Sequence, residues 1–278
     1  MGDFLVGHEA SIRLSCFLSI FLVMGVWELL APRRARVLHR QTRWPNNIAV
    51  VVINTMIVRI LLPTTAVGLA LWVSDRGWGL LNLMALPSEL AIVVGVLLLD
   101  LAIYAQHVVF HYVPALWRLH RMHHTDLDFD VTTGARFHPI EIVLSMLIKF
   151  GLIGLLGPPA LAVLIFEVLL NGTSMFNHSN VHIPKRIDGW LRCFVVTPDM
   201  HRVHHSVVRR ETDSNFGFNL PWWDRIFGTY TAEPGAGHRA MTIGIEQFRD
   251  KGEARIDRML TQPFRSDASP AGANSNLA

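Results

Sequence analysis

The chain contains little cysteine, little charge and only a small surplus of positive charge. Its 278 residues include two cysteines, Cys16 and Cys193, which excludes both a disulfide framework and a cysteine-rich zinc site. Charged residues make up 17% of the chain and the net charge is +3, too small a surplus to predict a nucleic-acid partner. Hydrophobic residues make up 51%. This composition favours an integral membrane protein over a soluble domain.

Four apolar regions predict how the chain crosses the bilayer. Runs at 11–31, 48–73 and 89–112 are each long enough to cross as a helix. The first run lacks a basic leader and a cleavage site, so we expect it to be a retained helix. A fourth region, 142–175, is interrupted by Gly157-Pro158-Pro159, which predicts a helical hairpin. Its arms are short enough that both full crossing and entry from one side stay open.

The predicted organisation is one all-α membrane-embedded domain over residues 1–260. Segments 113–141 and 176–260 form a helical cap, and the small, polar stretch 261–278 is expected to be a disordered tail. The loop after the first span is rich in arginine, which predicts a cytoplasmic location for that loop and for the cap. These arginines are Arg33, Arg34, Arg36, Arg40 and Arg43.

Histidine is concentrated in the segments that flank the later spans. Of 14 histidines, 11 lie between positions 107 and 205, and ten of them form two copies of H-x-x-x-H followed by H-x-x-H-H. Residues three and four apart share one helix face, so their imidazoles converge, while adjacent histidines reach two nearby centres. Ten neutral nitrogen donors suit two transition-metal ions better than one. The predicted ligands are His107, His111, His120, His123, His124, His178, His182, His201, His204 and His205.

Other polar residues are candidates for supporting roles near the metal. Metal-bound histidines normally donate their second ring nitrogen to a carboxylate or carbonyl. Several carboxylates lie near the clusters, and we expect Asp199, beside the second triplet, to be such a partner. His138 either supports the centre or simply begins a helix. The other carboxylates are Asp126, Asp128, Asp130, Glu141 and Asp224.

Two charges fall inside predicted spans, where charges are usually paired or functional. Asp100 lies 11 residues before His111, and Arg59 lies 11 residues after Ile48. Both would be about 16 Å deep on antiparallel helices, which predicts an ion pair between them. The alternative is that one of them faces a cavity alone. Trp222 and Trp223 are expected to anchor the cap at the lipid headgroups.

These motifs together resemble the fatty acid hydroxylase/sterol desaturase superfamily of membrane di-iron enzymes. The resemblance runs from about Asp100 to Thr229 and rests on the two histidine clusters and a closing signature. The motifs are Asp100 with His107 and His111, Trp117-Arg-Leu-His-Arg-Met-His-His124, Arg136-Phe-His-Pro139, Asn177-His178 with His182, Met200-His-Arg-Val-His-His205, Asn215-Phe-Gly217 and Trp223-Asp-Arg-Ile-Phe-Gly-Thr229.

The resemblance implies that the ten histidines bind two iron ions at the cytoplasmic membrane surface, with O2 as co-substrate. Asp100, Asp199 and His138 are the residues expected behind these ligands. A separate donor (cytochrome b5, a ferredoxin or a reductase) is implied, because the chain has neither a His-Pro-Gly-Gly haem motif nor a G-x-G-x-x-G. Beyond the metal, no further cofactor or catalytic side chain is expected.

The function expected on this basis is hydroxylation or desaturation of a lipid C–H bond, with hydroxylation favoured. Sterol, fatty acyl, carotenoid and ether-lipid substrates all stay open. A membrane metal carrier is disfavoured because transporter ligands lie at mid-membrane depth. A zinc-dependent membrane hydrolase is disfavoured because such sites usually include a carboxylate ligand or base.

Overall fold

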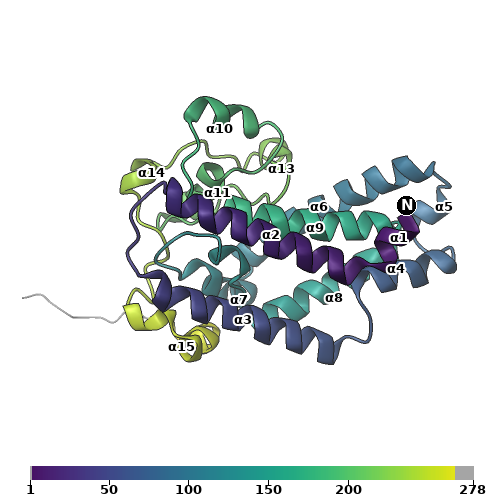
Figure 1. The fold of residues 1–278 in the computed structure, drawn as a ribbon, viewed down its shortest axis with the longest axis horizontal. Coiled ribbons are helices and arrows are strands. Elements are labelled where there is room, and N and C mark those ends of the chain that lie inside the picture. Colours follow the sequence, from purple (N-terminus) through teal and green to yellow (C-terminus); the bar gives the residue numbers. More distant parts are fainter. Residues whose placement is uncertain (1, 267–278) are drawn as a thin grey trace, which may run out of the picture.

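The computed structural model describes residues 2–266, and within that range it is helical with no strand. Long helices run side by side, and the cap, made of α7 and α10 to α15, gathers at one end of them (Figure 1). In chain order the helices are α1 (Gly2–Gly7), α2 (Glu9–Leu30), α3 (Arg40–Leu61), α4 (Ala66–Asp75), α5 (Leu80–Leu83), α6 (Ser88–Tyr112), α7 (Pro114–His124), η1 (Thr133–Ala135), α8 (Pro139–Leu156), α9 (Ala160–Asn177), α10 (Lys185–Leu191), α11 (Pro198–His204), α12 (Arg209–Thr212), α13 (Trp222–Ile226), α14 (Gly237–Ala240), η2 (Lys251–Ala254), α15 (Ile256–Thr261) and η3 (Gln262–Phe264).

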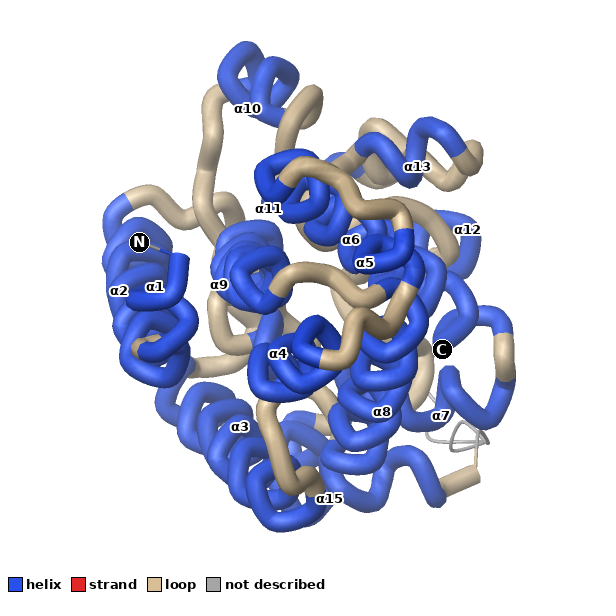
Figure 2. The backbone as a smooth tube through the Cα atoms, turned by 90° about the vertical axis from the view of Figure 1, so that its right-hand side faces the viewer, coloured by secondary structure: helices blue, strands red, loops and turns tan. Residues whose placement is uncertain are grey.

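Five helical segments are long and apolar enough to cross a membrane. They confirm the predicted all-α, multi-span fold. Seen along the long axis, α9 lies between α2, α4 and α6 (Figure 2). The apolar core between α4, α6, α8 and α9 includes Leu99, Ile153 and Phe166. The segments are Glu9–Leu30, Arg40–Leu83, Ser88–Tyr112, Pro139–Leu156 and Ala160–Asn177.

The second apolar run differs from the single helix expected over 48–73. The helix α3 begins earlier, at Arg40, and ends at Leu61, after which α4 begins at Ala66. Pro63 disfavours helical geometry in the residue before it. Thr65 then caps α4, since its side-chain oxygen accepts the N–H of Gly68 at 2.9 Å.

The predicted ion pair between Arg59 and Asp100 is wrong. Arg59 lies two residues from the end of α3 that is remote from the cap, and it is exposed. Asp100 is buried on α6 and accepts hydrogen bonds from Asn219 and Trp223, each at 2.8 Å. The aspartate is therefore satisfied by the cap, while Arg59 stays exposed on the outer face of α3.

The helical hairpin forms where the glycine and prolines predict it. Gly157 ends α8 with a φ of +60°, and α9 begins directly after Pro159. A Cβ at Gly157 would lie 2.3 Å from the carbonyl oxygen of Trp78, so only glycine fits this turn. Deep between the arms, Lys149 and Glu167 form an ion pair at 2.9 Å.

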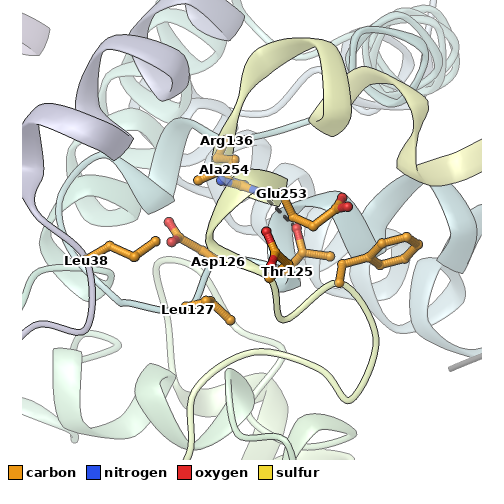
Figure 3. A pocket seen from close by; sticks show the side chains of 9 residues that line it. Leu38, Thr125, Asp126, Leu127, Arg136, Glu253 and Ala254 are labelled. Atoms are coloured by element: carbon orange, nitrogen blue, oxygen red, sulfur yellow. Dashed lines mark hydrogen bonds between the residues drawn. The ribbon is translucent and has the colours of Figure 1, made fainter. Parts of the chain in front are cut away.

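Buried charges attach the cap to the spans. Arg43, near the start of α3, reaches Asp126 at 2.6 Å and Asp130 at 2.5 Å in the loop after α7. A small pocket behind this loop is lined by Asp126 and Arg136, with no histidine in its lining (Figure 3). Two further arginines of the predicted cytoplasmic loop are also paired, Arg33 with Asp199 and Arg40 with Glu28. These three arginines therefore have structural partners within the chain.

The disordered tail was predicted to begin at residue 261, which is too early, because residues 261–264 are helical. Thr261 ends α15, and η3 follows directly, with Gln262 completely buried. The side chain of Gln262 accepts a hydrogen bond from Thr125 at 2.8 Å, which ties this segment to the end of α7. Residues 267–278 lie outside the described residues.

Candidate metal centre

Nine of the ten predicted histidines come together in two groups, and every one of the nine is buried. Within each group, one ring nitrogen per residue lies within 4.8 Å of the others. The first histidine group is His107, His111, His120, His124 and His204. The second histidine group is His123, His178, His201 and His205.

Helix geometry explains how two short helices supply both groups. In α7, His120 and His124 are four residues apart and share a face, whereas His123 is a helical step away and faces the second group. At the end of α11 the neighbours His204 and His205 divide in the same way. This is the division that adjacent histidines predict.

His182 belongs to neither group. It is exposed, and its backbone N–H donates to the carbonyl of Ala31 at 2.9 Å. The helix α9 ends at Asn177, so His178 and His182 do not share a helix face. The H-x-x-x-H spacing is therefore not helical in this copy, and we leave His182 out of the proposed ligands.

The first histidine group has carboxylates behind it. The Nδ1 of His120 lies 2.6 Å from Glu141 Oε1, and that of His111 lies 3.3 Å from Asp213 Oδ1. Such contacts on one ring nitrogen orient the other nitrogen toward a metal and raise its basicity. The Nε2 of His111 accordingly has no hydrogen-bond partner although it is buried.

Backbone carbonyls hold the outward nitrogens of two more histidines of this group. The carbonyl of Phe216 accepts from His107 Nδ1 at 2.7 Å, and that of Ser214 accepts from His204 Nδ1 at 2.8 Å. Asp224 fixes the first of these carbonyls, because its carboxylate accepts the backbone N–H groups of Phe216 and Gly217 at 2.8 and 2.9 Å. The closing signature of the family thus acts as a support for His107.

The second histidine group converges on His178. Its Nε2 lies 3.1 Å from the Nε2 of His123 and of His201, and 3.2 Å from that of His205. Its Nδ1 donates to the carbonyl of Ser174 at 2.7 Å. The Nδ1 atoms of the other three histidines are buried without a hydrogen-bond partner.

Aromatic rings, not carboxylates, pack around this second group. Phe137 stacks on His123 with 4.4 Å between ring centroids, and Phe129 lies 5.0 Å from His205 and 5.4 Å from His178. Two aromatic rings therefore lie against this group, and in the described chain no carboxylate hydrogen-bonds its imidazoles.

The residues present fit two metal ions. Burial, followed by the neighbouring histidines, lowers the pKa of His123, His124 and His205 well below the usual 6.5. These rings are therefore neutral, as metal ligation requires. Both ring nitrogens of His124 are buried without a hydrogen-bond partner, which is costly unless a cation takes one of them. All-imidazole donor sets suit iron, zinc, copper or nickel.

The two groups adjoin. The rings of His124 and His205 stack with centroids 4.5 Å apart, and those of His201 and His204 lie 5.0 Å apart. Two ions held by these groups would be neighbours in one dinuclear centre.

The supporting residues differ from those expected. Asp199 contacts neither group; it pairs with Arg33 at 2.9 Å and with Arg202. Two residues apart on α11, Asp199 and His201 face different directions. Asp100 holds Asn219 and Trp223 and touches no histidine.

His138 begins a helix, which was one of its two expected roles. Its Nδ1 accepts the N–H of Ile140 at 3.2 Å at the start of α8. Glu141, one of the carboxylates near the clusters, is the residue that reaches His120. Asp213 was missed, because only its place eight residues after His205 pointed to it.

The chain is a multi-span helical protein with two adjoining, buried histidine groups at one end of its spans. These features define a class of membrane protein with a histidine-rich centre. Residues 92–229 match the family model described as fatty acid hydroxylase, and this range contains all nine histidines of the two groups. The chain belongs to the fatty acid hydroxylase/sterol desaturase superfamily.

Comparison with characterised proteins finds lipid-modifying relatives. The ornithine lipid hydroxylase OlsE of Rhizobium tropici is 30% identical over 178 residues, which is 64% of this chain and 51% of that protein. The alkylglycerol monooxygenase of Homo sapiens is 30% identical over 139 residues, 48% of this chain and 29% of that protein. The cholesterol 25-hydroxylase of Rattus norvegicus is 25% identical over 166 residues, 58% of this chain and 53% of that protein. The matches span about half of these relatives or less. No solved structure matches the chain.

Proposed function

We propose that this protein is an O2-dependent lipid hydroxylase whose nine buried histidines hold two iron ions. The observation that carries the proposal is the convergence of these nine buried imidazoles on two adjoining points. The relatives' names support hydroxylation over desaturation, since those compared above are called hydroxylases or monooxygenases. Sterol, fatty acyl and related lipids remain candidate substrates.

Bound iron would supply O2 activation and the cleavage of an unactivated C–H bond, chemistry for which side chains have no equivalent. The chain's own residues supply orientation and a dry site. Glu141 and Asp213 orient two ligands of the first group. Phe218 excludes water, because its ring lies 4.9 Å from His107 and 5.9 Å from His201.

The height of the centre supports a lipid substrate. His107 lies 19 residues after Ser88 in α6, and His178 lies 18 residues after Ala160, the first residue of α9. At 1.5 Å per residue, both are about 27–28 Å above the far ends of their helices. Because the hydrocarbon core is about 30 Å thick, the centre lies near the boundary between acyl chains and headgroups. This height favours a C–H bond near the polar end of the lipid.

The arginine-rich loop between α2 and α3 supports a cytoplasmic location for the centre. Electrons would come from an external donor: cytochrome b5, a ferredoxin or a reductase.

Lipid profiling with isotopic oxygen tests the proposal. Membranes of a host that expresses the protein under ¹⁸O2 should contain a lipid that gains one labelled oxygen, absent from a host with a His201→Ala, His204→Ala variant. A product that has lost two hydrogens would instead identify a desaturase. An expressing, iron-loaded host that contains neither product would contradict both hydroxylation and desaturation.

Two other functions fit the site less well. A membrane metal carrier would have its ligands at mid-membrane depth, whereas these groups lie at the ends of α6 and α9. A zinc-dependent hydrolase would use a carboxylate in the ligand set, and the two groups consist of histidine alone. Iron with reductant-dependent O2 uptake supports the oxygenase; zinc without uptake supports hydrolysis.

A further inference from the structure

Two short helices of the cap carry a patch of large apolar side chains that no other part of the described chain covers. On α10 and just after it, Ile187, Trp190 and Phe194 are 53–64% exposed. On α13 and just after it, Trp222, Ile226 and Phe227 are 42–65% exposed. The indole N–H of Trp222 donates to the carbonyl of Cys193 at 2.7 Å, which joins the two helices. We call these six side chains the α10–α13 patch. A patch of this kind indicates an interaction surface.

The height of α13 can be read from its contacts with α6. The indole N–H of Trp223 donates to Asp100 at 2.8 Å, the ring of Phe227 stacks on Tyr104 at 5.5 Å, and Thr229 bonds the Tyr104 hydroxyl at 2.8 Å. Asp100 and Tyr104 lie 12 and 8 residues before the last residue of α6, or about 18 and 12 Å along the helix. The helix α13 is therefore packed well below the cap end of a membrane-spanning helix.

Comparison with the thickness of a bilayer places this level inside the lipid. The 25 residues of α6 extend about 37 Å, which exceeds a hydrocarbon core of about 30 Å by about 7 Å. With the core beginning at Ser88, Asp100 and Tyr104 lie about 11 and 5 Å below its cap-side boundary. Interfacial helices bury their apolar faces about 5–10 Å into this layer.

Basic residues flank the patch in the positions that lipid headgroups favour. Lys185 and Arg186 begin α10, and Arg225 lies on α13; all three are exposed. Cations beside an apolar face are typical of helices that lie on anionic membrane surfaces. Tryptophan, present twice in the patch, is enriched at the same level.

We propose that α10 and α13 are inserted into the cap-side leaflet, with the α10–α13 patch among the acyl chains and the three cations among the headgroups. The occupant of the patch is thus lipid, not a protein partner. The segment between Phe216 and Thr229, which supports His107, then lies within the leaflet beside α6. The centre would be flanked by lipid on this side. The proposal concerns membrane position alone, so it stands or fails independently of the metal and of the reaction.

Fluorescence quenching in lipid nanodiscs tests the proposal on the full-length chain. Cys16 and Cys193 are replaced by serine, and bimane is attached at Ile226→Cys. Leu22→Cys, exposed on the spanning helix α2, serves as the lipid control, and Lys251→Cys, exposed on the cap, serves as the aqueous control. Quenching by brominated phosphatidylcholine and by aqueous iodide is measured for each.

The label at Ile226 should match the Leu22 label within about twofold for brominated lipid and be protected from iodide. Quenching by iodide equal to that at Lys251 would show a solvent-exposed patch and overturn the proposal. Protection from both quenchers would show a protein partner or a second copy on the patch and would also overturn it. If Ile226→Cys fails to fold, a label on the native Cys193 in a Cys16→Ser chain gives the same test, since Cys193 is exposed beside Trp222.

Discussion

The two histidine groups share helices but differ in what lies behind them. In the first group, four outward ring nitrogens are held, two by the carboxylates of Glu141 and Asp213 and two by backbone carbonyls. In the second group, a carbonyl holds His178 alone, and Phe129 and Phe137 pack against the rings. The same sequence spacing thus produces one group with carboxylates in direct contact and one whose rings are contacted by aromatic side chains.

This difference teaches that the spacing of ligands and the properties of the site have separate origins. Local helix geometry in α7 and at the end of α11 supplies six of the nine ligands. The support comes from α8 and from the loop after α12, which are distant in sequence. Carboxylate support raises the basicity of a ligand, so we expect the first group to hold its metal more tightly.

The largest effect is expected from removing one ligand of each group. His204→Ala should reduce the metal content of the first group, and His201→Ala that of the second, because each leaves a cation with fewer donors. Turnover should fall below detection in both variants, since both halves of the centre are required. Metal content per chain and ¹⁸O incorporation are the measurements, and His39→Ala is the control outside the groups. A variant with two metals and ordinary turnover would break the proposed ligand set.

A smaller effect, confined to the first group, is expected from its carboxylates. Glu141→Gln should weaken metal binding there about 10–100-fold, because His120 loses a charged partner at 2.6 Å. Asp213→Asn should do less, since that contact is longer at 3.3 Å. Chelator competition measures both. In the wild type, the chelator should remove the metal of the second group first. Glu141→Gln should make the release of the two metals more similar or reverse its order. Equal release from both groups in the wild type would remove the contrast drawn here.

Acid is expected to destabilise the metal-free protein. Burial lowers the pKa of His124, His201, His204 and His205 well below 6.5, so they stay neutral when folded, whereas the unfolded chain takes up protons below about pH 6.5. Their contribution to stability is complete above pH 6.5 and is lost as the pH falls below it. Thermal unfolding should therefore occur at least about 5 °C lower at pH 5.5 than at pH 7.5. His205→Gln should reduce this difference, and an unchanged midpoint would contradict neutral buried rings.

The smallest effect is expected at His182. His182→Ala should retain both metals and turnover within about twofold, because this side chain is exposed and outside both groups. Loss of a metal ion in this variant would mean that the segment after α9 rearranges to bring His182 to the centre. Metal content, measured beside His178→Ala as the matched ligand variant, decides between these results.

Much of the fold could be predicted because lipid demands long apolar helices. Apolar runs located the spans, and Gly157 with two prolines located the hairpin. The end of α3 was missed because the apolar sequence continues across Pro63 although the helix ends before it.

The centre was predictable where local geometry decides it and not where tertiary packing does. Eight of the nine ligands follow from i, i+3 and i, i+4 spacing near helix ends, whereas His178 has no helical partner among them. His182 depends on where α9 stops and on the chain passing α2, where Val181 forms an isolated bridge with Pro32. Similarly, Glu141 reaches His120 through the packing of α8. Proximity in sequence to the second triplet favoured Asp199 and could not indicate this contact.

The most direct test of the central claim is the metal content of the purified, unmodified chain, combined with Mössbauer spectroscopy after growth on ⁵⁷Fe. Two iron ions per chain with the signature of a coupled, nitrogen-ligated pair are the predicted result. A single ion per chain, or two ions too far apart to couple, would contradict a dinuclear centre built from these nine histidines.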